Sequence, residues 1–434
     1  MTNSLQGWGL ALLNQIAGAQ WPDRLGLRQP MEKLVYWSSR ESFRWATTTL
    51  RPFADQPGQR HRLTTSANKP QLFDLSLSDE QQQMVDTISR FAQDKIYPLA
   101  HQADTQCSIP DELLQASKEL GLRYYAVSET WGGMATEAST MTQALIAEAL
   151  AHGDYSIAAV LLSPVSVANA LNRWGSGPQQ ARYLPALIDE TSPLDATIAV
   201  MEPGSLFNPL QLKTTAQRLG DSYILQGDKT LVLNGNKAQL YLIAAQTPEG
   251  PAVFLVEGGQ AGLTWRSTPA MGLKAAETSD LHLEAVRLPL SARLGDNDFN
   301  YQEFLDYGSL GWCALATGCA QAALDYVIPY CNEREAFGEP ISHRQGVAFT
   351  IAQMAIEIES MRILTWRAAA RAEAGNEFHR EAYLARIFCA EKSMFIGTNA
   401  VQLLGGHGFT KEHPVERWYR DLRSTAILWG GLHL

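Results

Sequence analysis

The segment that decides the fold runs from Gln402 to Asp421 and reads QLLGGHGFTKEHPVERWYRD. A helix is predicted just before it, from about Glu381 to Leu404, and it would end at the glycine pair Gly405-Gly406. Because glycine has no Cβ, such a pair lets another group come close to the backbone. Taken alone, GGHG indicates a turn, and His407 within it is typical of a solvated or capping side chain. The whole segment is longer and more distinctive than any of its parts.

The chain around this segment is predicted to be helical from Tyr301 onward. Small residues gather between Ala314 and Ala323, which suits a helix that packs closely against its neighbours. Met354, Ile358 and Met361 recur at helical spacing and predict the buried face of the next helix. The last third of the chain is therefore predicted to form a four-helix type of bundle.

Between about Leu194 and Asp296 the apolar residues follow the pattern of strands. Short apolar runs such as Leu240–Ile243 and Val253–Val256 are separated by Gly, Asn and Asp. Several strands at such short intervals favour an antiparallel sandwich or barrel over alternating strands and helices.

Upstream of the strands the pattern is again helical. Ser78 and Gln81 form a capping-box pattern at the start of this region. A helix is predicted from Ser156 to Trp174, and Pro164 is expected to interrupt it, since proline removes a helical hydrogen bond. The fold class is therefore α+β and multidomain, with an N-terminal extension at 1–71, a helical domain at 72–193, a β domain at 194–297 and a helical domain at 298–434.

Composition excludes several functions. With 45% hydrophobic and 18% charged residues, the 434-residue chain is typical of a soluble globular protein. Its net charge of -10 argues against a nucleic-acid partner, which needs a basic face. The five Cys form no CxxC pair, so no metal site is indicated and the thiols fit the cytoplasm. No apolar run is expected to reach the ~18 residues that span a bilayer.

The first 70 residues differ from the rest of the chain. They hold nine Lys or Arg against four Asp or Glu, whereas the remainder holds 26 against 41, and they contain four of the Trp residues. Leu10, Leu13 and Ile16 recur at helical spacing, which predicts an amphipathic helix. One interpretation is an extension packed on the body. The other is an arm, residues 1–50, that contacts a partner or the surface of a membrane.

Four segments carry a resemblance to a known family. They are GSGPQQARYLP at 175–185, MEPG at 201–204 with GDKTLVLNGNKA at 227–238, REAFG at 334–338 with Gln345, and the segment from Gln402 to Asp421. Each is weak alone, but in this order and spacing they resemble the acyl-CoA dehydrogenases over about residues 75–431. The resemblance implies an N-terminal helical domain, a central β domain and a C-terminal helical bundle.

The resemblance also implies a chemistry. The family converts acyl-CoA thioesters into trans-2-enoyl-CoA: a Glu removes the α-proton while a β-hydride moves to the flavin of FAD. The base must be aimed at the proton, and the thioester oxygen must be held by hydrogen bonds. Members are dimers or tetramers in which the neighbouring subunit holds the ADP half of each FAD. We therefore expect a homo- or hetero-oligomer that takes an acyl-CoA or an acyl-carrier thioester.

The residues that the resemblance assigns to the ADP half of FAD are present. Arg334 suits a diphosphate, because its planar fork of donors pairs with oxyanions. The full set is Arg334, Phe337, Gln345, Gln402, Gly405 and Gly406.

The residues that the resemblance assigns to the flavin ring are largely absent. Where the family has TEPGAGSD, this chain has MEPGSLFN, so Met201 replaces a hydroxyl. Where the family has Trp-Ile-Thr, this chain has Leu231-Val-Leu, and Leu233 replaces the Thr that bonds the flavin near N5. A buried polar ligand group left unpaired typically costs ~1–3 kcal/mol.

The catalytic base of the family is missing as well. Trp429 stands at one family position of the Glu, and Gly308 stands at the other, followed by Ser309 where an Arg is common. Glu303 and Asp306 lie on the same predicted helix, but we expect Asp306 to be structural or to orient the substrate and Glu303 to face elsewhere. The family's closing helix is also expected to be absent after Leu434.

Four interpretations stay open. The chain is an active FAD enzyme with an unusual base, or a degenerate member that completes the FAD site of a catalytic partner. It is otherwise a binding or scaffold protein without FAD, or a flavin monooxygenase of the same fold that needs no Glu.

Overall fold

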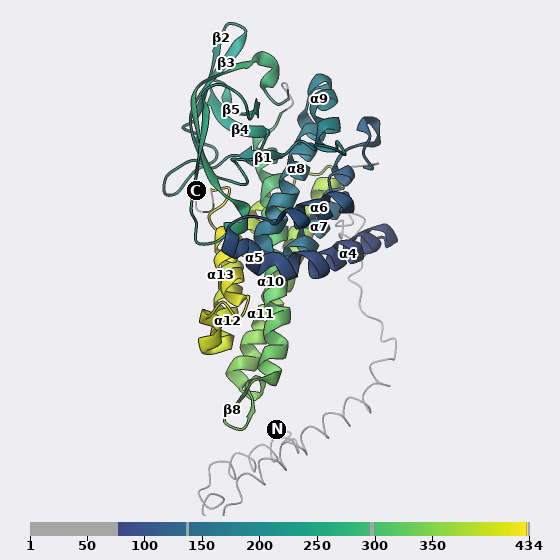
Figure 1. The fold of residues 1–434 in the computed structure, drawn as a ribbon, viewed down its shortest axis with the longest axis vertical. Helices are drawn as coiled ribbons and strands as arrows, with labels where there is room; N and C mark the ends of the chain where they lie inside the picture. The colour runs from purple at the N-terminus through teal and green to yellow at the C-terminus, as the bar shows by residue number, and fades with distance from the viewer. Residues whose placement is uncertain (1–76, 136–138, 296–298, 431, 433–434) are drawn as a thin grey trace, which may run out of the picture. The chain divides into compact units, whose positions relative to one another are not determined.

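The computed structural model describes residues 77–135, 139–295, 299–430 and 432, and the predicted N-terminal extension and its arm lie outside these residues. Helices come first, a β-sheet follows, and a second group of helices ends the described chain (Figure 1). The predicted fold class is thereby confirmed, and the residue limits of the domains stay predictions.

The first part of the described chain is helical. Ser78 caps its first helix as predicted: its hydroxyl accepts a bond from the Gln81 N–H, and the Gln81 side chain accepts one from the Ser78 N–H, both at 3.1 Å. The helices are α4 (Asp79–Phe91), α5 (Tyr97–Gln106), α6 (Asp111–Leu120), α7 (Thr140–Gly153), α8 (Tyr155–Trp174) and α9 (Gly177–Leu187). Short turns are the π-helical η1 (Ala92–Ile96) and the 3-10 turns η2 (Tyr124–Ala126) and η3 (Glu129–Trp131).

Helix α8 runs unbroken from Tyr155 to Trp174, so the predicted interruption at Pro164 is wrong. Proline removes one helical hydrogen bond, but most side chains on both sides of it are buried in the protein, and this packing supports the helix. By length and composition α8 is apolar enough to cross a membrane, contrary to the expectation from the sequence. However, 67% of its most apolar window is buried inside the protein, as in a core helix.

The second part is one sheet in the order β1-β4-β2-β3-β7-β6, with β5 paired to β4. Most pairs are antiparallel as predicted, but β1 and β2 each pair with β4 in parallel. The strands β2 and β3 lie between β1 and β4 along the chain, so β1 and β4 are not joined by the short hairpin that an antiparallel pair allows. The strands are β1 (Ala196–Ala199), β2 (Thr215–Leu219), β3 (Ser222–Val232), β4 (Leu240–Thr247), β5 (Gly250–Glu257), β6 (Leu263–Ser267) and β7 (Ser279–Pro289), with 3-10 turns η4 (Lys274–Ala276) and η5 (Leu290–Ala292).

The third part is the C-terminal bundle. Met354, Ile358 and Met361 are fully buried, so the predicted core face is confirmed. The elements are α10 (Tyr301–Glu333), the hairpin β8 (Glu335–Ala336) and β9 (Glu339–Pro340), η6 (Ile341–His343), α11 (Gln345–Glu373), α12 (His379–Leu404), η7 (Gly405–Phe409) and α13 (Val415–Ser424). In Figure 1 the β8 hairpin lies at the end of the bundle farthest from the sheet.

One hydrophobic cluster joins all three parts. It contains side chains of α8 and α9, of β1 and β4, of the start of α10, and Trp429. The cluster places the first turns of α10 beside the sheet and brings the residues after α13 back to them. The candidate site lies at this junction.

Candidate functional site

The two sequence positions predicted for the family base meet in space. Trp429 lies with its indole ring against the backbone of Gly308, and a Cβ atom added at Gly308 would lie only 2.0 Å from Cζ2 of Trp429. Trp429 is buried, with 8% of its surface exposed. The indole therefore fills the space that any side chain at position 308 would need, and the two positions form one site without a carboxylate.

Trp429 is held in a strained conformation. Its φ angle is +69°, in the left-handed region that bulky residues rarely adopt. Its indole Nε1 donates a hydrogen bond of 3.0 Å to the carbonyl of Leu305 on α10. Ser309 donates its hydroxyl to the same carbonyl at 2.9 Å. These bonds fix the ring against α10 and leave the indole no free hydrogen for a ligand.

Arg386 anchors the turn that carries Trp429. This Arg lies on α12, is only 7% exposed, and donates to the carbonyls of Leu428 and, at 2.8 Å, of Gly430. Burial lowers the pKa of its guanidinium from its usual value. Sequence analysis missed Arg386. The signal that could have revealed it is an Arg that stands among the apolar, buried positions of α12.

Aromatic side chains close the site around Trp429. Phe304 packs against it, with ring centroids 6.0 Å apart. Phe207 packs on Gly430, where an added Cβ atom would lie 2.5 Å from its ring. Tyr301 donates its hydroxyl to the carbonyl of Pro209 at 3.0 Å. The loop after β1 and the turn after α13 are thus joined by aromatic packing.

A cavity of about 510 Å³ extends from this aromatic group, and we name it the central cavity. It is lined by α7, α8 and α10, by β1 and β3 with the residues that follow them, and by Leu428 and Trp429. Its volume is that of a small-molecule site. Among the described residues that line it, the only charged side chain is that of Arg173.

The two candidate carboxylates are both engaged elsewhere. Glu303 accepts a hydrogen bond from Arg173, the Arg that lines the cavity. Asp306 lies 3.0 Å from Nδ1 of His379 and accepts a bond of 3.1 Å from Gln302. Burial raises the pKa of Asp306, although His379 opposes this shift. Neither Glu303 nor Asp306 lines the central cavity.

The flavin-ring positions offer little to a flavin. Met201 and Leu233 are buried and line the central cavity with apolar side chains. Of the hydroxyls nearby, Thr230 donates to Asp280 at 2.6 Å, and Ser163 donates to Thr197 at 3.1 Å. The side chains at the predicted flavin-ring positions, Met201 and Leu233, therefore offer no hydrogen-bond donor to the polar edge of a flavin ring.

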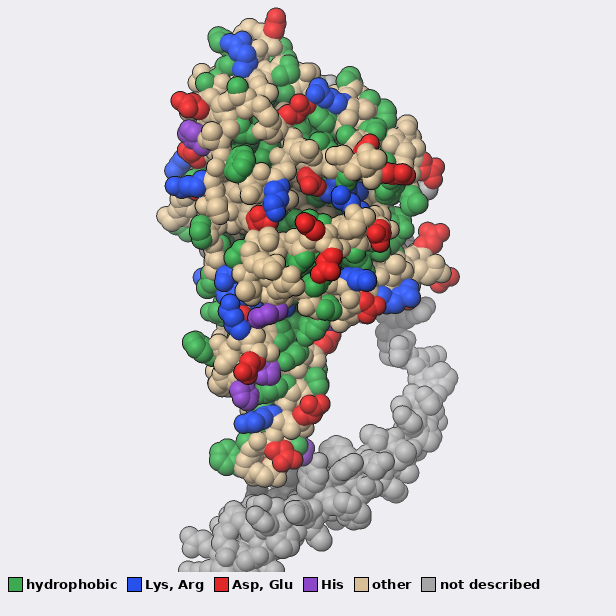
Figure 2. Space-filling model, in the orientation of Figure 1, with side chains coloured by type: hydrophobic (Ala, Val, Ile, Leu, Met, Phe, Trp, Pro, Cys, Tyr) green, Lys and Arg blue, Asp and Glu red, His purple; other side chains and the backbone are tan. Residues whose placement is uncertain are grey.

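The residues predicted for the ADP half of FAD lie on the surface of the bundle end. Phe337 is 97% exposed, and the rest of the set is exposed too. They come from the end of α10, the β8–β9 hairpin, the start of α11, and the end of α12 with η7. On this end of the bundle, Figure 2 shows hydrophobic side chains among charged ones. The predicted set Arg334, Phe337, Gln345, Gln402, Gly405 and Gly406 thus belongs to the bundle end and not to the central cavity.

Fold and cavity together define a class of protein with a helical part, a sheet and a helical bundle around one buried ligand cavity. Models of three domains of the acyl-CoA dehydrogenases match this chain: the N-terminal domain at residues 78–191, the middle domain at 197–286 and the C-terminal domain at 300–432. The chain belongs to the acyl-CoA dehydrogenase family.

Individual relatives agree with this assignment. The chain is 33% identical to the short/branched chain specific acyl-CoA dehydrogenase of Rattus norvegicus, over 82% of this chain and 83% of the relative. It resembles the structure of butyryl-CoA dehydrogenase from Megasphaera elsdenii with a TM-score of 0.76 and 29% identity, over 83% and 97%. It also resembles the prolyl acyl carrier protein oxidase AnaB, with a TM-score of 0.75 and 25% identity, over 82% and 97%.

Proposed function

We propose that this chain binds an acyl thioester without dehydrogenating it, and that it completes the FAD site of a catalytic partner subunit of the same family. One observation carries the proposal: the indole of Trp429 lies against Gly308 and occupies the place of the base. The central cavity remains large enough for a ligand.

The chemistry of the cavity argues against α-proton removal by this chain. A general base must reach the proton within hydrogen-bond distance, directly or through one water. Among the described residues that line the central cavity there is no Asp, Glu, His or Lys. The apolar lining suits the acyl chain of a thioester, since burial of apolar surface drives such binding.

The exposed set at the bundle end suits the ADP half of a FAD held by a neighbour. When bound to the partner, FAD supplies the hydride acceptor. Arg334 would hold its diphosphate, because a guanidinium pairs with oxyanions in a bidentate way. Gln345 and Gln402 would offer amide donors and acceptors, and the Gly405-Gly406 backbone permits close approach. None of these residues lines the central cavity of its own chain.

Exposed apolar side chains on the same bundle support a partner surface. Phe349, Ile356 and Ile363 recur every seven residues along α11 and are each at least 43% exposed. Such spacing places them on one face of the helix. The six residues predicted for the ADP half of FAD, named the ADP set, include Phe337, which is 97% exposed. Phe409, which follows the set in η7, is 89% exposed. Exposed apolar patches of this kind mark interaction surfaces.

The first test uses the purified full chain alone. The expected result is less than one flavin per chain in the visible absorbance spectrum, and no bleaching on titration with butyryl-CoA. A fluorescent butyryl-CoA analogue is nevertheless expected to bind. Stoichiometric FAD that is reduced by butyryl-CoA would overturn the proposal.

The second test addresses the partner. The chain is co-expressed with acyl-CoA dehydrogenases of its own organism and purified through a tag on this chain. A flavin-containing hetero-oligomer is expected, and Arg334→Ala in this chain should lower its flavin content. Arg380→Ala, an exposed Arg on α12, is the matched control and should leave the flavin content unchanged. Equal flavin content in the two variants would contradict the proposal that Arg334 and the ADP set bind the FAD of the partner.

An active enzyme with a moved base is the second candidate, because Glu303 is hydrogen-bonded to Arg173, which lines the central cavity. In that case a flavin-loaded preparation would be reduced by butyryl-CoA, and Glu303→Gln would slow the reduction by orders of magnitude. Our proposal expects no reduction in either protein.

A further inference from the structure

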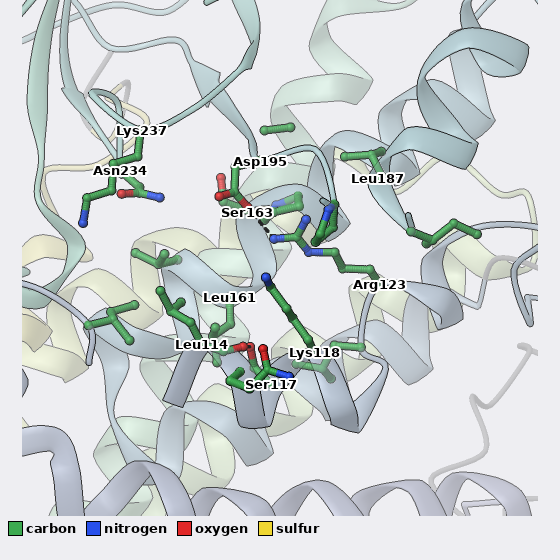
Figure 3. Close-up of a pocket in the computed structure, with 18 of the residues that line it drawn as sticks. Leu114, Ser117, Lys118, Arg123, Leu161, Ser163, Leu187, Asp195, Asn234 and Lys237 are labelled. Carbon is green, nitrogen blue, oxygen red and sulfur yellow. Dashed lines mark hydrogen bonds and ion pairs between the residues drawn. The ribbon is translucent and has the colours of Figure 1, made fainter. Parts of the chain in front are cut away.

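A second cavity, of about 380 Å³, lies between the first helical part and the sheet, and we name it the junction cavity. It is lined by α6 and the turn after it, by α8, by residues 187–197, and by two loops of the sheet at 234–238 and 275–277 (Figure 3). None of the positions that the family resemblance singled out as base or cofactor residues lies in it.

Two basic side chains face each other across this cavity. Figure 3 shows Lys118 extending from α6 into the cavity toward the guanidinium of Arg123. Arg123 donates to Asp195 at 2.5 Å and to the carbonyl of Leu194 at 3.0 Å. Lys118 is exposed, and among the described residues its side chain has no ion-pair or hydrogen-bond partner. An anion between the two side chains would be attracted by the charge of Lys118, and the guanidinium of Arg123 would offer it hydrogen-bond donors.

Five acidic side chains line the described part of the cavity: Glu119, Asp189, Glu190, Asp195 and Glu277. Glu119 accepts a hydrogen bond of 3.4 Å from Gln115, and Glu190 is exposed to solvent. Asp195 is paired with Arg123, and Glu277 with Lys237. Asp189 accepts three hydrogen bonds from Thr191 and Ser192 in its own turn. Asp195 and Glu277 thus neutralise Arg123 and Lys237, and the ammonium of Lys118 is left for a ligand.

The floor of the junction cavity is aliphatic, and its back wall is polar. The floor consists of Leu114, Leu122, Val160, Leu161, Leu187 and Ile188. Ser163 and Thr197 form the back wall with their hydrogen bond of 3.1 Å, and they line the central cavity as well. Pro164 also lines the cavity, and because proline has no N–H the carbonyl of Val160 lacks its helical partner.

Two residues of the rim have strained backbones. Asn234 and Glu277 have φ angles of +47° and +43°, and both line the junction cavity. Non-glycine residues in this region cost about 1–3 kcal/mol each and gather at functional sites.

We propose that the junction cavity is a second ligand site that binds an aliphatic carboxylate. The carboxylate lies between Lys118 and Arg123, and the alkyl tail covers the aliphatic floor. This proposal is independent of the function proposed above, because it needs neither FAD nor a partner. The site shares the Ser163–Thr197 wall with the central cavity, so one ligand lies directly behind the other.

The test is calorimetric titration of the purified full chain with octanoate, with butyrate, and with inorganic phosphate. Octanoate is expected to bind more tightly than butyrate, and phosphate more weakly than either, since the floor adds apolar contact. Lys118→Glu is expected to weaken octanoate binding at least about tenfold, and Lys118→Arg to preserve it. Lys95→Glu, an exposed Lys of η1, is the matched control and should change nothing.

A further variant separates the two cavities. Gly311 lines the central cavity, and a Cβ atom there would meet no atom within 4 Å, so Gly311→Leu fills that cavity without a clash at its Cβ. Octanoate binding should survive Gly311→Leu. Loss of binding in this variant would place the carboxylate in the central cavity and overturn the proposal. Absence of binding to the unmodified chain, or equal binding by Lys118→Glu, would overturn it as well.

Discussion

The bundle end and the central cavity of this protein have diverged from the family in opposite ways. At the exposed bundle end the residues predicted for the ADP half of FAD match the family, although substitutions there would cost little stability. In the buried cavity, Met201, Leu233, Gly308 and Trp429 depart together. A retained exposed residue indicates a contact outside the chain, whereas coordinated buried changes indicate a repacked interior. The comparison teaches that the two positions predicted for the family base are packed against each other in the interior.

The largest expected effect tests that packing. Trp429→Ala should destabilise the protein by about 3–5 kcal/mol, because it removes a buried indole and leaves a cavity. The shift of the denaturation midpoint in urea measures it. A change in the free energy of unfolding below about 1 kcal/mol would show that the indole of Trp429 is not packed as part of the core.

Gly308→Ala tests the contact between the two base positions. The added Cβ atom would lie 2.0 Å from the indole, so we expect a loss of about 1–3 kcal/mol from overpacking. The double variant Gly308→Ala/Trp429→Ala should be no less stable than Trp429→Ala alone. Additive losses in this double-mutant cycle would mean that the two positions do not interact.

Arg386→Met tests the support of the turn that carries Trp429. The variant loses the bonds to the carbonyls of Leu428 and Gly430, and we expect a loss of about 2 kcal/mol. Thermal unfolding measures the loss, and Arg386→Lys should retain part of the stability. An unchanged unfolding temperature in Arg386→Met would contradict the anchoring role.

A pH dependence should come from Asp421 in the interior. Burial, reinforced by the negative charge of Asp154, raises the pKa of Asp421 from 3.8 to about 7. The folded state then holds a proton that the unfolded state has released, so stability is fully present below pH 3.8 and falls as the pH rises to about 7. Asp421→Asn should flatten this fall between pH 5 and pH 7 in urea midpoints. If stability fell with pH equally in the unmodified chain and in Asp421→Asn, the titration of Asp421 would not be the cause of the fall.

The smallest effect is expected at the bundle end. Phe337→Ala should change stability by no more than about 0.5 kcal/mol, because the ring is 97% exposed. Its effect should instead be on association, measured by sedimentation of the hetero-oligomer. A large loss of stability in the isolated chain would show that Phe337 packs within its own chain.

Much of the architecture could be predicted from local patterns. The capping box at Ser78 and the core face around Met354 could be predicted because caps and helical periodicity depend on residues that are close in sequence. Pro164 was misjudged, since the packing that keeps α8 intact is tertiary. The parallel pairing of β1 with β4 was missed for a related reason: strand direction depends on a crossover between segments far apart in the chain.

By itself the sequence determined the family and the lack of a Glu at either family position of the base, because both follow from the order and spacing of the matching motifs. The set for the ADP half of FAD stays a prediction from the same motifs. Only the tertiary structure decided that Trp429 and Gly308 form one site, that Arg386 holds the turn beneath it, and that Lys118 faces Arg123 in a second cavity. The physical reason is distance along the chain: Trp429 and Gly308 are far apart in sequence, and only the packing of α10 against the turn after α13 brings them into contact.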